Sequence, residues 1–194
     1  MILLVDVGNT KVKWRMLDDE MNIVQAGSVK SSEFTNNYAS VEFYGISISF
    51  LYVSNVASNK VSIIFEKLAK QKKAEYREFK SQRHILKVRF GYKNVDEFGV
   101  DRALALVGAY SAKGVLVIDA GSAITADYLN DKGEHLGGYI IPGLWMTKGL
   151  LGSGTERVDA CIGPGVKDLG ITTSECVNNG SVILFHSLLD GLIV

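Results

Sequence analysis

The N-terminal part of the chain places apolar residues in short runs and alternations that favour strands over helices. The apolar run that begins at Ile2 ends in the turn Asp6–Thr10, and residues Val12–Leu17 alternate between apolar and polar. A polar turn follows, and Ile23–Val29 has the composition of a third strand. Three strands joined by tight turns predict an antiparallel meander. The polar stretch Ser31–Asn37 predicts a loop.

Further along the chain, the apolar spacing changes between the strand period and the helix period. Patterns of buried strands occur at Phe50–Ser54 and at Val115–Ser122, where the strand ends in a turn. Further strand patterns occur at Ala74–Lys80, Ile124–Leu129 and Leu136–Ile141. Helical spacing occurs at Lys60–Lys72, Phe98–Ala112, Leu144–Leu151 and Glu175–Leu189. The order of these elements predicts an α/β protein with mixed sheets and flanking helices.

The chain repeats its first motif. The run LLVDVG at Leu3–Gly8 matches VIDAG at Val117–Gly121, so that Asp6 corresponds to Asp119 at an offset of 113 residues. The acidic turn after the second strand of each copy matches as well. Two unrelated hairpins with ordinary Asp-x-Gly turns are the alternative. The shared register over about 25 residues favours a duplication.

Composition and charge exclude several classes of protein. The 194 residues are 47% hydrophobic and 22% charged, with 21 basic and 21 acidic side chains. This balance is typical of a soluble folded protein, and it disfavours disorder and nucleic-acid binding through a basic field. No apolar run is long enough to span a bilayer, so no membrane partner is expected. Cys161 and Cys176 lack a paired spacing and predict free thiols in a reduced cytoplasm.

A duplicated Asp-x-Gly turn suits phosphate binding. The aspartate lies at a rigid strand end, and the glycine lacks a Cβ, so the backbone N–H groups of the turn can approach an oxyanion closely. Asn9, Thr10 and Ser122 add side-chain donors. Two such turns facing each other would hold a nucleoside triphosphate, with a carboxylate for Mg²⁺, as in the two-lobed plan of actin-like ATPases. Walker and GxGxxG motifs are absent, which leaves P-loop and Rossmann folds without support.

A second constellation precedes the predicted helix at Phe98–Ala112. Gly99 permits a turn, and Asp101 then lies in the first helical turn, where the helix dipole favours a carboxylate. Asp101 is therefore either a helix-stabilising residue with Arg102 on a solvated face, or a base that positions an alcohol and accepts its proton during phosphoryl transfer.

Five motifs in order along nearly the whole chain resemble the type III pantothenate kinase family. They are DVGNTKVKW from Asp6 to Trp14, GVDR from Gly99 to Arg102, IDAGSAIT from Ile118 to Thr125, the GG…PG segment from Gly137 to Gly143, and LGITT from Leu169 to Thr173 with Gly180. Each motif is loose by itself, but the ordered set is specific.

The resemblance implies a duplicated actin-like, ribonuclease H-like fold of two lobes. We expect residues 1–112 to form the N-terminal lobe with the phosphate motif, and residues 113–194 to form the C-terminal lobe. The implied activity is the ATP-dependent phosphorylation of pantothenate to 4'-phosphopantothenate, the first step of coenzyme A biosynthesis, by a cytoplasmic homodimer. Family members run on beyond the position of Val194, so we expect the C-terminal lobe to lack its last strand–helix unit.

The resemblance also implies roles for single residues. Asp101 would be the catalytic base. The residues that would bind ATP and its phosphates are Asp6, Gly8, Asn9, Thr10, Lys13, Gly121 and Ser122. The residues that would bind pantothenate are Tyr92, Gly99, Val100, Arg102 and Thr173, with Arg102 pairing the substrate carboxylate and Thr173 reaching it from the partner subunit. Asp6 would hold Mg²⁺ through the phosphates, and Asp119 would hold a monovalent cation, K⁺ or NH₄⁺.

Three positions depart from the family pattern, and two alternatives stay open. Ala103 stands where Trp is frequent, Val95 where Pro is frequent, and Ser122 where Thr is usual. The first departure and the short C-terminus favour a non-catalytic regulatory relative. Another small-molecule kinase of the same superfamily is the second alternative, although it should lack the GVDR segment.

Overall fold

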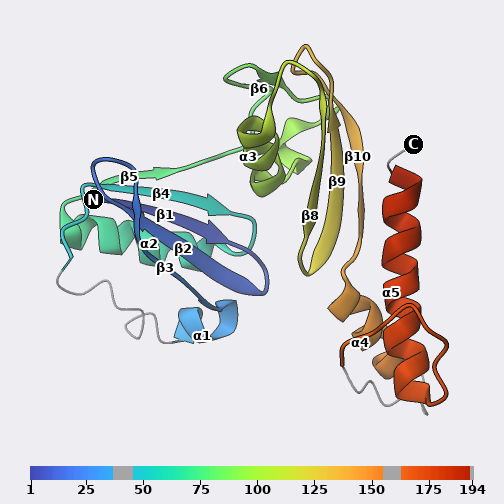
Figure 1. Cartoon of the computed structure of the whole chain (residues 1–194). Coiled ribbons are helices and arrows are strands. Elements are labelled where there is room, and N and C mark those ends of the chain that lie inside the picture. The colour runs from blue at the N-terminus through green and yellow to red at the C-terminus, as the bar shows by residue number, and fades with distance from the viewer. Residues whose placement is uncertain (37–45, 155–162, 193–194) are drawn as a thin grey trace. The chain divides into compact units, whose positions relative to one another are not determined.

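The computed structural model describes residues 1–36, 46–154 and 163–192 (Figure 1). Contacts between Cα atoms divide the chain into two compact units, which are described separately. The first contains residues 1–117 and 127–137, and the second contains residues 118–126 and 138–194. The expected lobe boundary near residue 112 stays a prediction.

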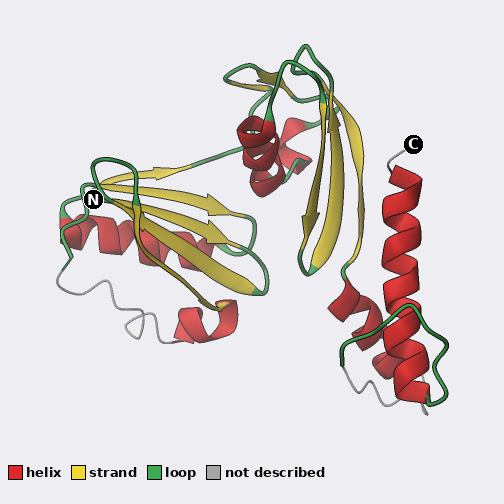
Figure 2. Cartoon of the chain, in the orientation of Figure 1, coloured by secondary structure: helices red, strands yellow, loops and turns green. Residues whose placement is uncertain are grey.

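A five-stranded sheet forms the N-terminal part of the first unit (Figure 2). Its strands are β1 (Ile2–Val7), β2 (Lys11–Leu17), β3 (Ile23–Lys30), β4 (Phe50–Asn55) and β5 (Glu75–Glu78), in the spatial order β3-β2-β1-β4-β5. The pairs β1–β2 and β2–β3 are antiparallel, whereas β1–β4 and β4–β5 are parallel. The predicted meander is therefore confirmed and is extended by two parallel strands.

One face of this sheet is covered by helix α2 (Asn59–Lys72), the helix predicted at Lys60–Lys72 (Figure 1). Along β1 every second residue is buried, which places Leu3, Val5 and Val7 in the core beneath Phe65 of α2. The alternation leaves Asp6 on the opposite face, because successive side chains of a strand point to opposite sides. The period of the strand thus removes the phosphate-motif carboxylate from the core.

The loop predicted at Ser31–Asn37 is wrong in part, because residues Ser31–Asn36 form helix α1. Phe34 is 2% exposed and stacks on Phe65 with ring centroids 5.0 Å apart. The hydroxyl of Thr35 donates to the carbonyl of Ser31 over 2.8 Å. Burial of the Phe34 ring therefore stabilises a short helix that the polar sequence around it does not predict.

The rest of the first unit packs around a second core. It contains a 3₁₀ turn (Val95–Glu97), helix α3 (Val100–Ala109) and the short strands β6 (His84–Ile85) and β7 (Val88–Arg89). Phe90, Phe98, Leu106 and Leu129 are buried together here. Helix α3 begins two residues later than the predicted Phe98, because Phe98 is extended and buried before the first turn.

A three-stranded sheet of order β10-β9-β8 contains β8 (Val115–Ala120), β9 (Ala123–Leu129) and β10 (His135–Pro142), as the sequence predicts. The second unit contains helices α4 (Leu144–Gly154) and α5 (Thr173–Leu192), the two helices predicted at the end of the chain. None of the helices in the described ranges is long and apolar enough to cross a membrane.

Candidate active site

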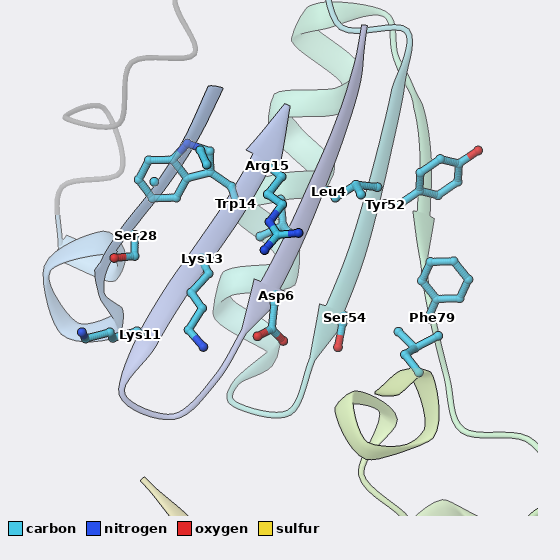
Figure 3. Close-up of a pocket in the computed structure, with 14 residues that line it drawn as sticks. Leu4, Asp6, Lys11, Lys13, Trp14, Arg15, Ser28, Tyr52, Ser54 and Phe79 are labelled. Atoms are coloured by element: carbon cyan, nitrogen blue, oxygen red, sulfur yellow. The ribbon is translucent and has the colours of Figure 1, made fainter. Parts of the chain in front are cut away.

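The carboxylate of Asp6 lies at the end of β1, between two polar neighbours (Figure 3). Asp6 pairs with Lys13 of β2 in the antiparallel register and with Ser54 of β4 in the parallel register. Ser54 is 8% exposed, and its hydroxyl has no hydrogen-bond partner among the residues that the structure describes. The sheet thus places a carboxylate, an ammonium group and a hydroxyl on adjacent strands.

The turn after Asp6 is tight and is braced by helix α1. The amide of Gly8 donates to the carbonyl of Lys11 over 3.0 Å, and a Cβ on Gly8 would lie 3.3 Å from that carbonyl oxygen. The hydroxyl of Ser31 donates to the carbonyl of Gly8 over 2.8 Å, and the amide of Ser31 donates to Thr10 over 2.9 Å. Asn9 and Thr10 are exposed at the tip, where a ligand can reach them.

A cavity of about 830 Å³ opens on this face of the sheet (Figure 3). Its basic residues come from one strand, β2: they are Lys11, Lys13 and Arg15. Asp6 and Ser54 line it as well, and Leu104 of α3 borders it. Three cations beside one carboxylate give a site that can attract a polyanion while keeping one ligand for a divalent cation.

The GVDR segment forms the first turn of α3. Gly99 is the N-cap residue and has no side chain with which to cap the helix. The Oδ1 atom of Asp101 accepts from the amide of Arg102 over 2.7 Å instead. Its Oδ2 atom has no hydrogen-bond partner within the described part of the chain. Asp101 is therefore held by one oxygen and can accept a proton at the other.

Arg102 is buried, so its predicted alternative on a solvated face is wrong. It is 7% exposed, and its Nε and Nη2 atoms donate to the two carboxylate oxygens of Asp127 over 2.8 and 2.6 Å. Its Nη1 atom donates to the hydroxyl of Tyr92 over 3.0 Å. Burial alone would lower the pKa of Arg102, but the hydrogen bonds to Asp127 and Tyr92 raise that pKa above its ordinary value. Arg102 is thus a fixed cation.

A second cavity, of about 480 Å³, lies beside the same turn. Gly99 and Val100 line it, together with Asn55 at the end of β4 and Ser81. The hydroxyl of Ser81 donates to the carbonyl of Phe98, which fixes the chain just before Gly99. The GVDR turn therefore borders a space that can take a small molecule.

The second Asp-x-Gly turn belongs to the other unit. Asp119, Gly121 and Ser122 are exposed there. The amide of Gly143 donates to the carbonyl of Ser122 over 2.9 Å, and a Cβ on Gly143 would lie 2.2 Å from the carbonyl oxygen of Gly121. The Pro-Gly segment singled out in the sequence thus packs directly under the second turn.

Thr173 begins helix α5 and is exposed. Its neighbour Thr172 caps the helix: the hydroxyl of Thr172 accepts from the amide of Glu175 over 3.2 Å, and the Glu175 carboxylate accepts from the amide of Thr172 over 3.2 Å. This reciprocal pair is a capping box. The cap leaves the Thr173 hydroxyl available to a ligand.

The predicted residues fall into three groups, and the members of the first two groups lie together. Asp6, Gly8, Asn9, Thr10 and Lys13 surround the first turn; Tyr92, Gly99, Val100, Asp101 and Arg102 surround the start of α3; Asp119, Gly121, Ser122 and Thr173 belong to the second unit. Sequence reasoning missed Ser54, Asp127 and His135. Of these, only Ser54 carried a signal, as a polar residue that ends a buried strand.

Comparison with known proteins tests the family resemblance. A sequence model of the type III pantothenate kinase family matches residues 2–194. The chain belongs to the type III pantothenate kinase family. The type III pantothenate kinase of Pseudomonas putida KT2440 is 33% identical over 96% of this chain and 78% of its own length. That of Alcanivorax borkumensis SK2 is 35% identical over 93% of this chain and 74% of its own length.

Solved structures confirm the actin-like α/β fold. A protein from Campylobacter jejuni assigned to the Baf family of transcriptional activators superposes with a TM-score of 0.60 at 20% identity, over 98% of this chain and 78% of its own. A Sinorhizobium meliloti protein assigned as a 2-dehydro-3-deoxygalactonokinase superposes with a TM-score of 0.61 at 10% identity, over 100% and 81%. At these sequence identities the superpositions are evidence for the fold but not for the activity. The family match therefore identifies the chain as a kinase relative.

Proposed function

We propose that this chain transfers the γ-phosphoryl group of ATP to the primary hydroxyl of pantothenate, the first step towards coenzyme A. The observation that carries the proposal is the turn Gly99–Arg102. One carboxylate oxygen of Asp101 accepts from the amide of Arg102 at the start of a helix, the other oxygen has no hydrogen-bond partner among the described residues, and Gly99 and Val100 of the same turn line a cavity, in a chain of the pantothenate kinase family.

The first turn suits the phosphates of ATP. Lys13 offers a charge-assisted donor, Gly8 leaves room for backbone donors, and Asn9 and Thr10 are exposed at the tip. Asp6 fits a magnesium ligand, because Mg²⁺ is commonly held by one or two carboxylates together with substrate phosphates. No group of three acidic, histidine or cysteine side chains that could hold a metal ion lies together in the described ranges. When bound, Mg²⁺ would neutralise phosphate charge.

Asp101 would act at the acceptor hydroxyl. As that hydroxyl oxygen forms its bond to the γ-phosphorus, the bond from the γ-phosphorus to the β–γ bridging oxygen breaks and ADP leaves. The hydroxyl proton passes to the free oxygen of Asp101, which Arg102 keeps in place through its amide. Positioning and charge neutralisation together supply most of the rate in such a transfer.

Tyr92, Val100 and Arg102 would bound the pantothenate site. The contacts of Arg102 with Asp127 and Tyr92 use three of its five N–H groups. The two N–H groups that remain on Nη1 and Nη2 could bind the substrate carboxylate. Arg102 would then bind pantothenate without leaving Asp127.

The second unit would complete the nucleotide and cation sites. Gly121 and Ser122 would contact the nucleotide, and the exposed carboxylate of Asp119 would hold K⁺ or NH₄⁺. Thr173 would reach pantothenate from the partner subunit of a homodimer. Support for a dimer comes from exposed apolar side chains on β10 and α4: these are Tyr139, Ile140, Trp145, Met146 and Leu150.

The test is ADP release by the purified 194-residue chain with Mg-ATP, measured with and without pantothenate and in potassium against sodium buffer. We expect release that needs pantothenate and is faster in potassium. Asp101→Asn should abolish turnover while ATP still binds. Asp19→Asn is the matched control, because it makes the same change at a side chain that is 99% exposed. Full turnover by Asp101→Asn would remove Asp101 as the base, and no release by the parent chain would contradict the kinase activity.

A further inference from the structure

A chain of four polar side chains runs from the start of α3 into the core of the first unit. Tyr92 accepts from Arg102, Arg102 donates twice to Asp127, and the Nε2 atom of His135 lies 2.9 Å from Oδ1 of Asp127. Asp127 is 2% exposed and the side chain of His135 is fully buried. These groups come from β9, β10, α3 and the segment before it, which are far apart in sequence.

The direction of each hydrogen bond can be assigned. Asp127 is ionised, because the hydrogen bonds from His135 and Arg102 outweigh the effect of burial, which alone would raise its pKa. An ionised carboxylate only accepts, so the Nε2 atom of His135 carries the proton and donates. The Nδ1 atom of His135 has no hydrogen-bond partner among the described residues.

Aromatic rings enclose this chain and restrict its movement. The guanidinium carbon of Arg102 lies 4.7 Å from the centre of the Phe98 ring. The ring of His135 stacks on that of Tyr92 at 6.0 Å and lies 5.0 Å from that of Phe98. His135 therefore contacts two parts of the arrangement, the carboxylate that holds Arg102 and the ring of Tyr92.

We propose that Asp127 and His135 are positioning residues that hold Arg102, and through it Asp101 and Tyr92, in the geometry needed for phosphoryl transfer. The inference rests on the function proposed above. Its basis is that Arg102 has two attachments: its side chain is clamped by Asp127, while its backbone amide binds Oδ1 of Asp101. Arg102 therefore links the buried carboxylate of Asp127 both to the phenol of Tyr92, through its guanidinium, and to Asp101, through its backbone amide.

The clamp has the properties of a positioning device. A bidentate pair between a guanidinium and a carboxylate fixes the plane of the guanidinium as well as its distance. An apolar side chain in place of Asp127 would fill the same space but would not fix the orientation of the guanidinium. His135 adds a third donor to Asp127, so that the carboxylate itself cannot rotate away from Arg102.

The experiment compares His135→Leu with His135→Gln in the full chain. Leucine removes the donor, whereas glutamine offers an amide N–H at a similar distance from the backbone. We expect His135→Leu to lower kcat about tenfold to a hundredfold, as misplaced reacting groups do, with the KM for ATP unchanged. His135→Gln should recover most of the rate. Asp131→Asn, on the exposed turn of the same hairpin, is the control and should leave kcat and KM as they are.

A second readout does not depend on activity. The buried Nε–H group of Arg102, bonded to Asp127, should give a slowly exchanging cross-peak in a ¹H–¹⁵N spectrum. Asp127→Asn should shift this cross-peak and speed the exchange of the Nε–H proton with water. The same variant tests the proposal if His135→Leu does not fold. An unchanged cross-peak in Asp127→Asn would overturn the proposal, as would a normal kcat in His135→Leu. A loss of kcat that glutamine does not recover, and that follows the loss of thermal stability, would overturn it too.

The two proposals fail in different ways. If the parent chain releases no ADP with pantothenate, the proposed function is wrong, whatever the spectrum shows. If the parent chain is active and His135→Leu is equally active, only the positioning role is wrong.

Discussion

A Cβ atom on Gly99 would lie 2.6 Å from the Oδ1 atom of Asp101. The φ angle of Gly99 is −56°, a value that any residue adopts, so its backbone conformation does not require glycine. What requires glycine is the space occupied by the carboxylate two residues later. The first glycine of the GVDR motif is thus explained by the position of the proposed base.

Gly99→Ala should lower kcat with little loss of stability. The contacted atom is the end of a side chain, which can move, so the free energy of unfolding should change by less than about 1 kcal/mol. The movement takes Asp101 away from the amide of Arg102, and kcat should fall about tenfold or more. The measurement is ADP release together with thermal unfolding.

Gly108→Ala provides the matched control within the same helix. A Cβ there meets nothing within 4 Å. Alanine in a helix interior is favoured over glycine by about 0.5–1 kcal/mol, so this variant should be slightly more stable and fully active. Equal kcat values for the two variants would contradict the explanation of Gly99.

The sequence predicted the elements that depend on local patterns. The meander around Asp6 and the helix after Gly99 follow from apolar period and turn residues, which neighbouring positions determine. Family membership followed from the ordered motifs and is confirmed. The burial of Arg102 could not be predicted, because its partner Asp127 is 25 residues away in the sequence. Asp127 belongs to strand β9, and the local sequence does not tell which face of that strand packs against α3. Helix α1 was missed for the same reason, since its stability depends on the contact between Phe34 and Phe65.

The stability of the chain should fall in acid, in part through Asp127. Its pKa in the folded state lies below the unfolded value of about 3.9. Between these two pKa values the unfolded state binds more protons than the folded state. The contribution of Asp127 to the free energy of unfolding is therefore fully present above about pH 4, and it is lost as the pH falls towards the folded pKa. Denaturant unfolding of the parent chain and of Asp127→Asn, from pH 7 down to pH 3, measures this contribution.

Asp127→Asn should be less stable at pH 7, because it leaves the buried cation of Arg102 without its counter-charge. Breaking one partner of a buried pair costs about 3–5 kcal/mol. The difference from the parent chain should shrink below about pH 4. Glu134→Gln is the control: its pair with Arg89 is 3.6 Å long and about half exposed, which makes it worth less than about 1 kcal/mol. A difference between the parent chain and Asp127→Asn that stays constant with pH would mean that Asp127 does not titrate as described.

Gly143→Ala should disturb the second Asp-x-Gly turn. A Cβ there would lie 2.2 Å from the carbonyl oxygen of Gly121 and 2.6 Å from that of Ser122, and both contacts are with backbone. The turn must therefore shift, so the KM for ATP should rise and thermal stability should drop. Gly149→Ala in α4, where a Cβ meets nothing within 4 Å, should change neither. A normal KM for ATP in Gly143→Ala would argue against a nucleotide contact at Gly121 and Ser122.

Thr172 and Thr173 are neighbours with separable roles. Thr172 caps α5 through the amide of Glu175, so Thr172→Ala should lower stability by about 0.5–2 kcal/mol. Thr173 is exposed and lies outside the cap, so Thr173→Ala should leave the melting temperature unchanged and raise the KM for pantothenate. Thr173→Ser keeps the hydroxyl and should restore that KM. If Thr173→Ala kept the parent KM, the hydroxyl would have no contact with pantothenate, and the helix start would serve folding alone.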